Sequence, residues 1–308
     1  MRTHFDLVVM HDPSEVTEKM LKDVSVVFAP LGYSFDEAFF RKAPKLRIIA
    51  TNTTGTPHID VKQANARGIR VVSLHEETEF LKKITPTAEL TIGLMIALTR
   101  NILPAVKFVL DGGWGRWNFA GVSMLSRMSL GIVGFGRLGK MVAKYARAFG
   151  MKVSFYDPYL ENEEEGPYAR VESLKDLVRQ NDIVSVHCSL HEKNQHMFSR
   201  DVFFSFKKGS FFINTARGEL VDSTALIDAL EAGILKGAAV DVLEGEFDPK
   251  FPEKVMEHPL VRYARKNQSL IITPHIGGST YDAWYMTQRH TILRTIDMIK
   301  RIKHEIES

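Results

Sequence analysis

The sequence has few of the features that mark secreted, membrane-spanning or metal-binding proteins. It contains one cysteine, Cys188, so no disulfide can form within the chain, and this suits a reducing compartment. No apolar run approaches the ~20 residues that a helix needs to span a bilayer. Charged residues also occur too early for a secretory signal peptide. We therefore expect a cytoplasmic protein with no membrane partner.

Charge of one sign and metal-ligand patterns are scarce as well. The formal net charge is +3 and the basic residues are scattered, so we expect no nucleic-acid partner. The 11 histidines are dispersed, and with a single cysteine they give no metal-ligand spacing, so no metal site is expected. A G-x-S-x-G nucleophile elbow is absent too. The sequence therefore gives no sign of metal-dependent catalysis or of a nucleophilic serine in a G-x-S-x-G turn.

Length and hydrophobic patterning indicate two α/β domains. A chain of 308 residues suggests two domains at ~150 residues each. In the first part, apolar runs at 5–11, 24–30, 46–52 and 69–74 predict strands, and 14–23, 34–43 and 58–68 predict the helices between them. A second series of strands is expected at 129–136, 151–157, 182–188, 210–216, 237–243 and 269–275. The alternation predicts two Rossmann-like, doubly wound parallel sheets with helices on both faces.

Two long helices are expected outside these series. The segment 85–110 is apolar around most of its circumference, which predicts a buried helix, and Pro104 should kink or interrupt it. The segment 279–307 predicts one long helix that could pack back on the first domain. The charge run at 161–166 is expected to be a solvated turn.

A glycine triplet, Gly134, Gly136 and Gly139, begins at the end of the strand segment 129–136 and opens a helix. Gly134 allows a tight turn, Gly136 lets the backbone approach a pyrophosphate, and Gly139 lets the helix pack close to the strand. Asp157 ends the next strand, 18 residues after Gly139 by subtraction of their numbers. That spacing suits an acid that binds the adenosine ribose, and its negative charge favours NAD over NADP. The alternative is a glycine-rich turn with a strand-end aspartate and no cofactor.

With these motifs in place, the chain resembles the D-isomer-specific 2-hydroxyacid dehydrogenases over nearly its whole length. The resemblance rests on "GIVGFGRLG", "FFINTARGELVD", "AAVDVLEGE" and "ITPHIGGST", in the family's order, with weaker matches at 54–72 and 87–100. It implies a flavodoxin-like substrate domain at 1–100 plus 281–308 and an inserted NAD-binding Rossmann domain at 101–280. It also implies a homodimer formed through the cofactor domain.

The resemblance assigns roles to individual residues. Arg217 is the substrate-binding arginine, Glu246 the acid and His275 the acid–base histidine, while Thr54 and Gly55 hold the substrate carboxylate. Asp241 faces the nicotinamide carboxamide. The expected cofactor-binding residues are Gly134, Phe135, Gly136, Arg137, Leu138, Gly139, Asp157, His187, Cys188, Ser189, Thr215, Ala216 and Asp241.

These residue types suit the reduction of a 2-oxoacid. A guanidinium binds carboxylate and carbonyl oxygens with a planar fork, and an imidazole transfers a proton near neutral pH. Glu246 would pair with and orient His275. His187 is the main rival histidine, because it also follows a strand, but we expect it to line the adenine side or to pack.

The sequence departs from the family pattern at several places. Phe247 follows Glu246 where the family has proline, and Pro57 replaces a commoner acidic residue. The segments 75–84 and 247–269 predict enlarged loops. These departures bear on substrate identity more than on reaction class.

We therefore expect an NAD-dependent oxidoreductase that interconverts a 2-oxoacid and its D-2-hydroxyacid. Glyoxylate, hydroxypyruvate, longer 2-oxoacids and phosphorylated acids all remain open as substrates. One alternative is a dinucleotide-sensing, corepressor-like scaffold without significant turnover. A second is a formate dehydrogenase, which by resemblance would carry glutamine at the position of Glu246.

Overall fold

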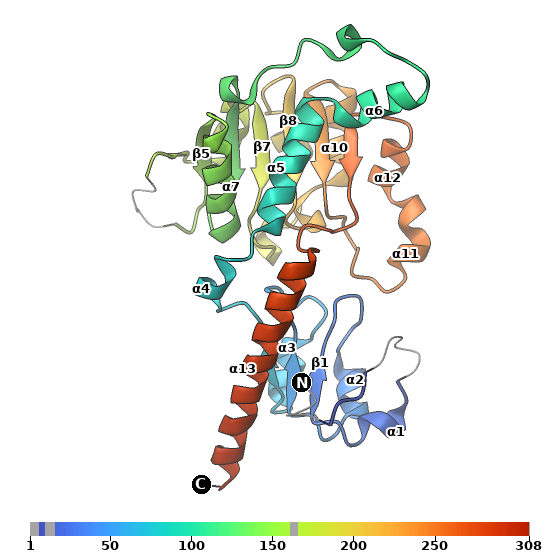
Figure 1. Cartoon of the computed structure of the whole chain (residues 1–308), viewed down its shortest axis with the longest axis vertical. Coiled ribbons are helices and arrows are strands. Elements are labelled where there is room, and N and C mark those ends of the chain that lie inside the picture. The colour runs from blue at the N-terminus through green and yellow to red at the C-terminus, as the bar shows by residue number, and fades with distance from the viewer. Residues whose placement is uncertain (1–5, 10–15, 161–165, 308) are drawn as a thin grey trace. The chain divides into compact units, whose positions relative to one another are not determined.

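The computed structural model describes residues 6–9, 16–160 and 166–307. The chain forms two compact units, Met1–Ile84 with Phe247–Pro249 and Thr280–Ser308, and Thr85–Glu246 with Lys250–Ser279. We call them unit 1 and unit 2 (Figure 1). Residues 85–100, which the sequence analysis groups with the first domain, belong to unit 2. The chain thus leaves unit 1 after Ile84 and re-enters it at Thr280, with a brief return at 247–249.

Unit 1 is built on a small parallel sheet. In the described part of the chain it has three strands in the order β1-β2-β3. Its elements are α1 (Glu18–Leu21), β1 (Val26–Phe28), α2 (Glu37–Lys42), β2 (Ile48–Ala50), α3 (Val61–Ala66), β3 (Arg70–Val72), α4 (Thr78–Leu81) and α13 (Tyr281–Glu307). The expected helix at 14–23 is therefore α1, and the loop expected at 75–84 contains the short helix α4.

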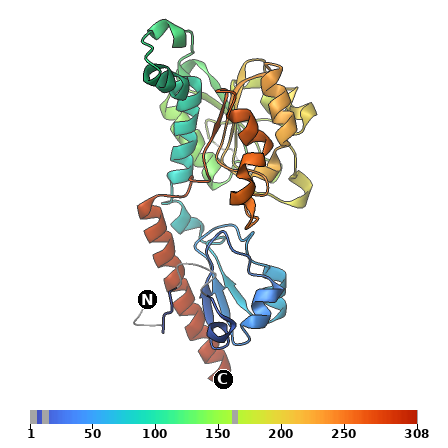
Figure 2. The same ribbon diagram turned by 90° about the vertical axis from the view of Figure 1, so that its right-hand side faces the viewer.

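Both faces of this sheet are covered, because successive strand residues point to opposite sides. Ile49 packs in a core with residues of α2 and α3. Ile48 and Ala50 pack with Met298 and Ile299 of α13 on the other face. Figure 2 shows α13 along one side of the sheet and α2 and α3 on the other. The expectation that the C-terminal helix packs on the first domain is confirmed.

The first expected strand, at 5–11, does not form in its described residues, so this prediction was wrong there. Residues 6–9 have no assigned strand, and Val8 and Val9 are 63% and 57% exposed. β1 pairs directly with β2, with Val26 opposite Ile48. Hydrophobic composition alone does not make a strand, because a strand also needs a partner edge for its backbone hydrogen bonds, and residues 6–9 pair with none of the three strands. The rest of the expected strand lies outside the described residues.

Unit 2 contains a larger parallel sheet, whose order in the described residues is β10-β9-β8-β7-β4-β5-β6. Its strands are β4 (Ser129–Val133), β5 (Lys152–Tyr156), β6 (Ala169–Arg170), β7 (Ile183–Val186), β8 (Ser210–Asn214), β9 (Leu235–Val240) and β10 (Leu270–Ile272). The six strands expected from sequence are present, and β6 is an addition. The direction of winding reverses between β4 and β7, and ligands bind beyond the carboxyl ends of strands at such a switch point.

Helices cover both faces of the larger sheet, as Figure 2 shows. The α-helices of unit 2 in the described residues are α5 (Pro86–Thr99), α6 (Ile102–Leu110), α7 (Arg137–Ala148), α8 (Leu174–Gln180), α9 (Arg200–Phe203), α10 (Ser223–Glu231), α11 (Phe251–Lys254) and α12 (Pro259–Ala264). One core joins the sheet to α5 and α7, and the other joins it to α8, α9, α10 and α12. The loop expected at 247–269 thus contains α11 and α12. The charge run expected at 161–166 lies, apart from Gly166, outside the described residues.

The helix expected at 85–110 is interrupted, as Pro104 suggested, but the break precedes the proline. Asn101 has a left-handed φ of 53°, and α5 and α6 diverge by 60°. Pro104 occupies the first turn of α6, where a backbone N–H has no intrahelical acceptor and its loss costs little. Helix α5 is largely buried, whereas α6 has no buried residue, so the expectation of a buried helix is correct only for α5.

Membrane-spanning potential is limited to one segment pair. Across the described ranges, no single helix is long and apolar enough to cross a bilayer, although Thr78–Thr99 and Ile102–Leu110 pass together as a bent pair by length and composition.

Candidate active site

The glycine loop joins β4 to α7 at the switch point. Gly134 has a φ of 87°, and a Cβ there would lie 2.5 Å from the backbone nitrogen of Cys188. A Cβ on Gly139 would overlap the Gly134 carbonyl oxygen. A Cβ on Gly136, in contrast, would meet no atom within 4 Å. The first and third positions therefore need glycine for packing, while the second leaves open space at the N-terminus of α7, where free N–H groups favour an anion.

Asp157 follows β5 and binds the glycine loop. Its Oδ2 accepts a hydrogen bond from the Phe135 N–H at 2.8 Å, and its Oδ1 accepts one from the Tyr159 N–H at 3.0 Å. A carboxylate has about four acceptor positions, so it can still accept from a ribose hydroxyl. Asp157 therefore connects the loop conformation to the expected ribose site.

The other loop residues differ in what they can offer a cofactor. The Phe135 side chain is fully buried and stacks on Phe155 with ring centroids 4.0 Å apart, so only its backbone can face a ligand. Leu138 is partly buried and packs against the core of the α5 and α7 face. Arg137 is partly buried, and this burial lowers the pKa of its guanidinium from the ordinary value.

The segment after β7 contains the rival histidine. His187 Nε2 lies 2.8 Å from the Ser185 hydroxyl, and burial lowers the pKa of His187 to about 3. An imidazole that stays neutral at pH 7 cannot donate a proton as an imidazolium. Burial also raises the pKa of the Cys188 thiol to about 12, and its Sγ lies 3.9 Å from Met197 Sδ. Ser189 is exposed.

Arg217 lies in the loop after β8, which the side chain of Asn214 shapes. Asn214 Oδ1 accepts from the Ala216 N–H at 3.0 Å, and its Nδ2 donates to the Arg217 carbonyl at 2.8 Å. The Arg217 guanidinium donates from Nη1 to the Ala216 carbonyl at 2.6 Å. Ala216 is buried, and the Thr215 hydroxyl lies 2.9 Å from that of Thr91 on α5. Thr215 and Ala216 therefore offer a cofactor mainly their backbone.

Asp241, at the end of β9, organises the turn that carries His275. Its Oδ1 accepts from the Thr273 hydroxyl at 2.6 Å and from the Ile276 N–H at 2.9 Å. Its Oδ2 accepts from the Gly277 N–H at 2.8 Å, and its backbone carbonyl accepts from the His275 N–H at 2.8 Å. Sequence reasoning assigned Asp241 to the cofactor alone and missed this anchoring role, although an acid at one strand end beside a glycine-containing turn at the next is a usable signal.

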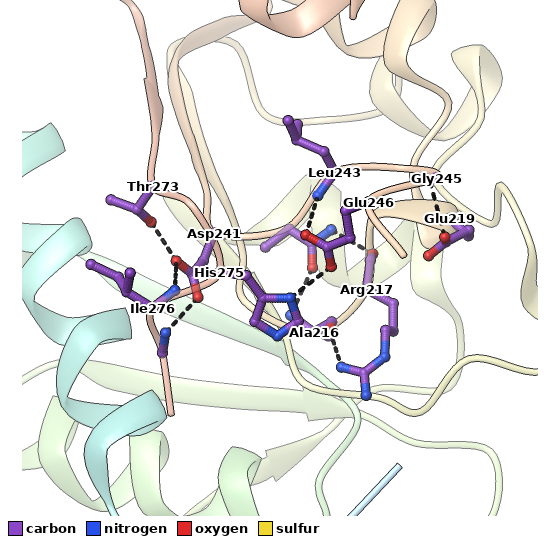
Figure 3. A network of polar contacts seen from close by, with 12 residues as sticks. Ala216, Arg217, Glu219, Asp241, Leu243, Gly245, Glu246, Thr273, His275 and Ile276 are labelled. Carbon is purple, nitrogen blue, oxygen red and sulfur yellow. Dashed lines mark hydrogen bonds and ion pairs between the residues drawn. The ribbon is translucent and has the colours of Figure 1, made fainter. Parts of the chain in front are cut away.

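His275 and Glu246 form the pair that the sequence suggested. His275 Nδ1 lies 2.7 Å from Glu246 Oε1. The Glu246 side chain is 11% exposed and that of His275 32%, so the carboxylate is largely shielded while the imidazole keeps an accessible edge. His275 has a φ of 52°, a left-handed conformation that is uncommon for residues other than glycine. Figure 3 shows the imidazole between the turn anchored by Asp241 and the loop that carries Glu246, with the Arg217 side chain nearby.

The remaining expected residues lie elsewhere. Thr54 and Gly55 follow β2 in unit 1, where the Thr53 hydroxyl donates to the Gly55 carbonyl at 2.6 Å. Arg217, Glu246 and His275 all belong to unit 2. Within the described ranges, no group of three or more His, Cys, Asp or Glu side chains is placed to hold a metal ion.

Comparison with known proteins identifies the family of the chain. Residues 92–277 match the family model described as D-isomer specific 2-hydroxyacid dehydrogenase, NAD binding domain. A glyoxylate reductase of Thermococcus kodakarensis is 34% identical over 295 residues, which cover 92% of this chain and 84% of that protein. The chain belongs to the D-isomer specific 2-hydroxyacid dehydrogenase family.

Other relatives extend the comparison. A D-3-phosphoglycerate dehydrogenase of Methanocaldococcus jannaschii is 35% identical over 87% of this chain, which spans about half of that relative, 48%. The crystal structure of a D-lactate dehydrogenase from Aquifex aeolicus, complexed with NAD and lactic acid, has a TM-score of 0.80 at 27% identity. The structural alignment covers 96% of this chain and 88% of the lactate dehydrogenase chain.

As a member of this family, the protein is an NAD-dependent oxidoreductase that transfers a hydride between nicotinamide and a 2-oxoacid/D-2-hydroxyacid pair. The alternative of a corepressor-like scaffold without turnover finds no support among these relatives.

Proposed function

We propose that Arg217, Glu246 and His275 carry out the reaction. The observation that supports this most directly is the 2.7 Å contact between His275 Nδ1 and Glu246 Oε1. A carboxylate at Nδ1 holds that nitrogen as an N–H donor, which leaves Nε2 to exchange a proton with the substrate. During reduction, Nε2–H donates its proton to the carbonyl oxygen of the 2-oxoacid. During oxidation, neutral Nε2 accepts the proton of the hydroxyl group.

Arg217 binds the substrate in this proposal. Its guanidinium can contact the substrate carboxylate and the carbonyl oxygen with two parallel N–H groups, which polarises the carbonyl and orients it. The loop shaped by Asn214 holds the start of this side chain at the carboxyl end of β8. We assign the backbone of Thr54 and Gly55 to the substrate carboxylate, as the family resemblance implies.

The residues around the glycine loop fit NAD. The open space beside Gly136 and the N-terminus of α7 suit the pyrophosphate, and Asp157 suits the ribose hydroxyls. Arg137, His187, Cys188 and Ser189 line the expected nucleotide side, with Thr215 and Ala216 toward the nicotinamide. When bound, NAD supplies or accepts the hydride. In this assignment, unit 2 is the cofactor domain and unit 1 the substrate domain.

We propose a small 2-oxoacid as the substrate, with glyoxylate as the first candidate because the Thermococcus kodakarensis relative is a glyoxylate reductase. NADH consumption, measured by the absorbance of the reduced nicotinamide, should be followed with glyoxylate, hydroxypyruvate, a longer 2-oxoacid and a phosphorylated one. Glyoxylate should give the highest kcat/KM. A preference for the phosphorylated acid would overturn the substrate proposal, and loss of the preferred activity in His275→Ala, with NADH binding intact, tests the proton-donor assignment.

We further propose a cytoplasmic homodimer that associates through α6. Its exposed apolar residues include Val106, Val109 and Leu110, which are 51%, 47% and 81% exposed, and these three line an apolar hollow together with residues of α5. Exposed apolar surface of this kind favours a second protein surface. Sedimentation of the parent should give a dimer and Val106→Glu a monomer, whereas a monomeric parent would contradict the proposal.

A further inference from the structure

The position of Glu246 depends on a short loop after β9. We call residues 243–246, which carry Glu246 at their end, the acid loop. Its internal hydrogen bonds are long: the Glu246 N–H donates to the Leu243 carbonyl at 3.3 Å, and the Leu243 N–H donates to Glu246 Oε2 at 3.4 Å. Contacts this long are at the weak end of the range for N–H···O bonds. Leu243 is anchored in the hydrophobic core, so contacts from outside the acid loop matter most for the residues between it and Glu246.

Two side chains from other segments bind the middle of the acid loop. Glu219 Oε1 accepts a hydrogen bond from the Gly245 N–H at 3.2 Å, as Figure 3 shows. His196 Nε2 lies 2.9 Å from Glu244 Oε1. The two contacts hold consecutive residues of the acid loop, immediately before Glu246.

The two side chains are themselves joined to each other. The His196 N–H donates to the Glu219 carbonyl at 2.8 Å, and Phe198 and Val221 form a parallel bridge beside them. His196 adopts a left-handed φ of 49°, which directs the backbone through this contact. A Cβ on Gly218 would overlap the backbone of Leu243 and Glu244, so the acid loop lies directly against this segment.

The His196 and Glu244 side chains are partly exposed, so their contact affects the position of the acid loop more than the stability of the whole protein. The side chains of His196 and Glu244 are 43% and 36% exposed, and exposed ion pairs add little to global stability. For Glu246 to assist His275, however, its carboxylate must lie within hydrogen-bond distance of His275 Nδ1. A small displacement of the acid loop would break that contact without unfolding the protein.

We infer that His196 and Glu219 are positioning residues that hold the acid loop so that Glu246 reaches His275. This rests on the proposed role of Glu246. Neither residue needs to touch the substrate or the cofactor. Their effect on the reaction passes through Glu246, which distinguishes them from residues that merely stabilise unit 2.

Single variants give the first test. Glu219→Ala and His196→Gly should each lower kcat/KM for the preferred 2-oxoacid about threefold to tenfold, the effect of losing one modest hydrogen bond. Glycine keeps the φ of 49° at position 196 accessible. Glu219→Gln should retain nearly full activity, because the glutamine amide oxygen can still accept from the Gly245 N–H. Glu231→Ala, at an exposed position at the end of α10, is the matched control and should match the parent.

A double-mutant cycle with Glu246→Gln decides the inference. In that background, Glu219→Ala and His196→Gly should each change kcat/KM less than about twofold, since the residue through which they act is already impaired. Titration with NADH and a thermal melt of each variant report folding. Equal losses in both backgrounds, or no loss in the parent, would overturn the positioning role. Parent-like activity of Glu246→Gln alone would instead show that the proposed role of Glu246 is wrong.

Discussion

Asp157 offers a sharp test of the proposed cofactor site, because its bond to the glycine loop and its proposed contact with the ribose use different acceptor positions. Its Oδ2 accepts from the Phe135 N–H at 2.8 Å, and the expected ribose contact uses the remaining acceptor positions. Asp157→Asn keeps a carbonyl oxygen for Phe135 but removes the negative charge. A hydrogen bond to a charged acceptor contributes ~1.5–3 kcal/mol and a neutral one ~0.5–1.5 kcal/mol. NADH binding should therefore weaken by about 1–1.5 kcal/mol, or about fivefold to tenfold in Kd.

NADPH should respond in the opposite direction. Two charges ~5 Å apart repel by on the order of 1–3 kcal/mol at the effective dielectric of a protein surface or of water. Removing the carboxylate charge relieves this repulsion toward the 2′-phosphate. NADPH should thus bind about tenfold more tightly to Asp157→Asn than to the parent, by the ~1.4 kcal/mol equivalence of a tenfold change.

Fluorescence titration of parent and variant with both nucleotides measures the four dissociation constants. Asp157→Ala is the companion variant, because it also removes the acceptor of the Phe135 N–H. It should lower the free energy of unfolding by about 1–3 kcal/mol. Asp157→Asn should lower it less, because its amide oxygen still accepts from the Phe135 N–H, while its NH2 group can no longer accept from the Tyr159 N–H. An unchanged ratio of NADH to NADPH affinity in Asp157→Asn would refute the assignment of Asp157 to the ribose.

Two further predictions concern Arg217, the proposed substrate-binding residue, and His187. Arg217→Lys keeps the positive charge but loses the planar fork, so steady-state kinetics should show kcat/KM lowered about 10- to 100-fold with NADH affinity unchanged; near-normal turnover would remove Arg217 from the site. The pKa of His187 is about 3 when folded, against an ordinary value of 6.5, so the unfolded chain takes up a proton first as the pH falls. The contribution of neutral His187 to the free energy of unfolding is therefore fully present above pH ~6.5. It is lost progressively down to pH ~3, by about 2 kcal/mol at pH ~5. Urea unfolding at several pH values should show a shallower acid loss in His187→Asn, and identical pH dependence in both proteins would contradict the assignment.

Local features of the sequence were predictable because their causes are local. The glycine triplet indicated a turn between β4 and α7, and the conformation of Gly134 and the packing of Gly139 are consequences of missing side chains at fixed spacing. The strands of unit 2 were recognisable as short apolar runs, since parallel strands in a covered sheet are buried on both faces. The family motifs likewise marked Arg217 and His275 by their immediate neighbours.

Segments whose structure depends on a distant partner were predicted less well. Residues 6–9 have the composition of a strand, but β1 and β2 pair without them. The apolar face of α6 was expected to be buried like that of α5, yet the break at Asn101 turns it away from the core. In both cases the segment is as apolar as expected. Whether a partner surface lies beside it depends on other parts of the chain, and the sequence of the segment does not contain that information.

The reaction class and the glycine loop could be inferred from short motifs, because each depends on residue types at fixed spacing, and the same motifs led us to propose Glu246 and His275 as an acid–base pair. How these groups are held depends on contacts between segments that are distant in the chain. The bonds from Asp241 to the turn of His275 span 35 and 36 positions, and the bond from Glu219 to Gly245 spans 26. Contacts between loops at the ends of different strands depend on the order of strands in the sheet, and no single stretch of sequence contains that order.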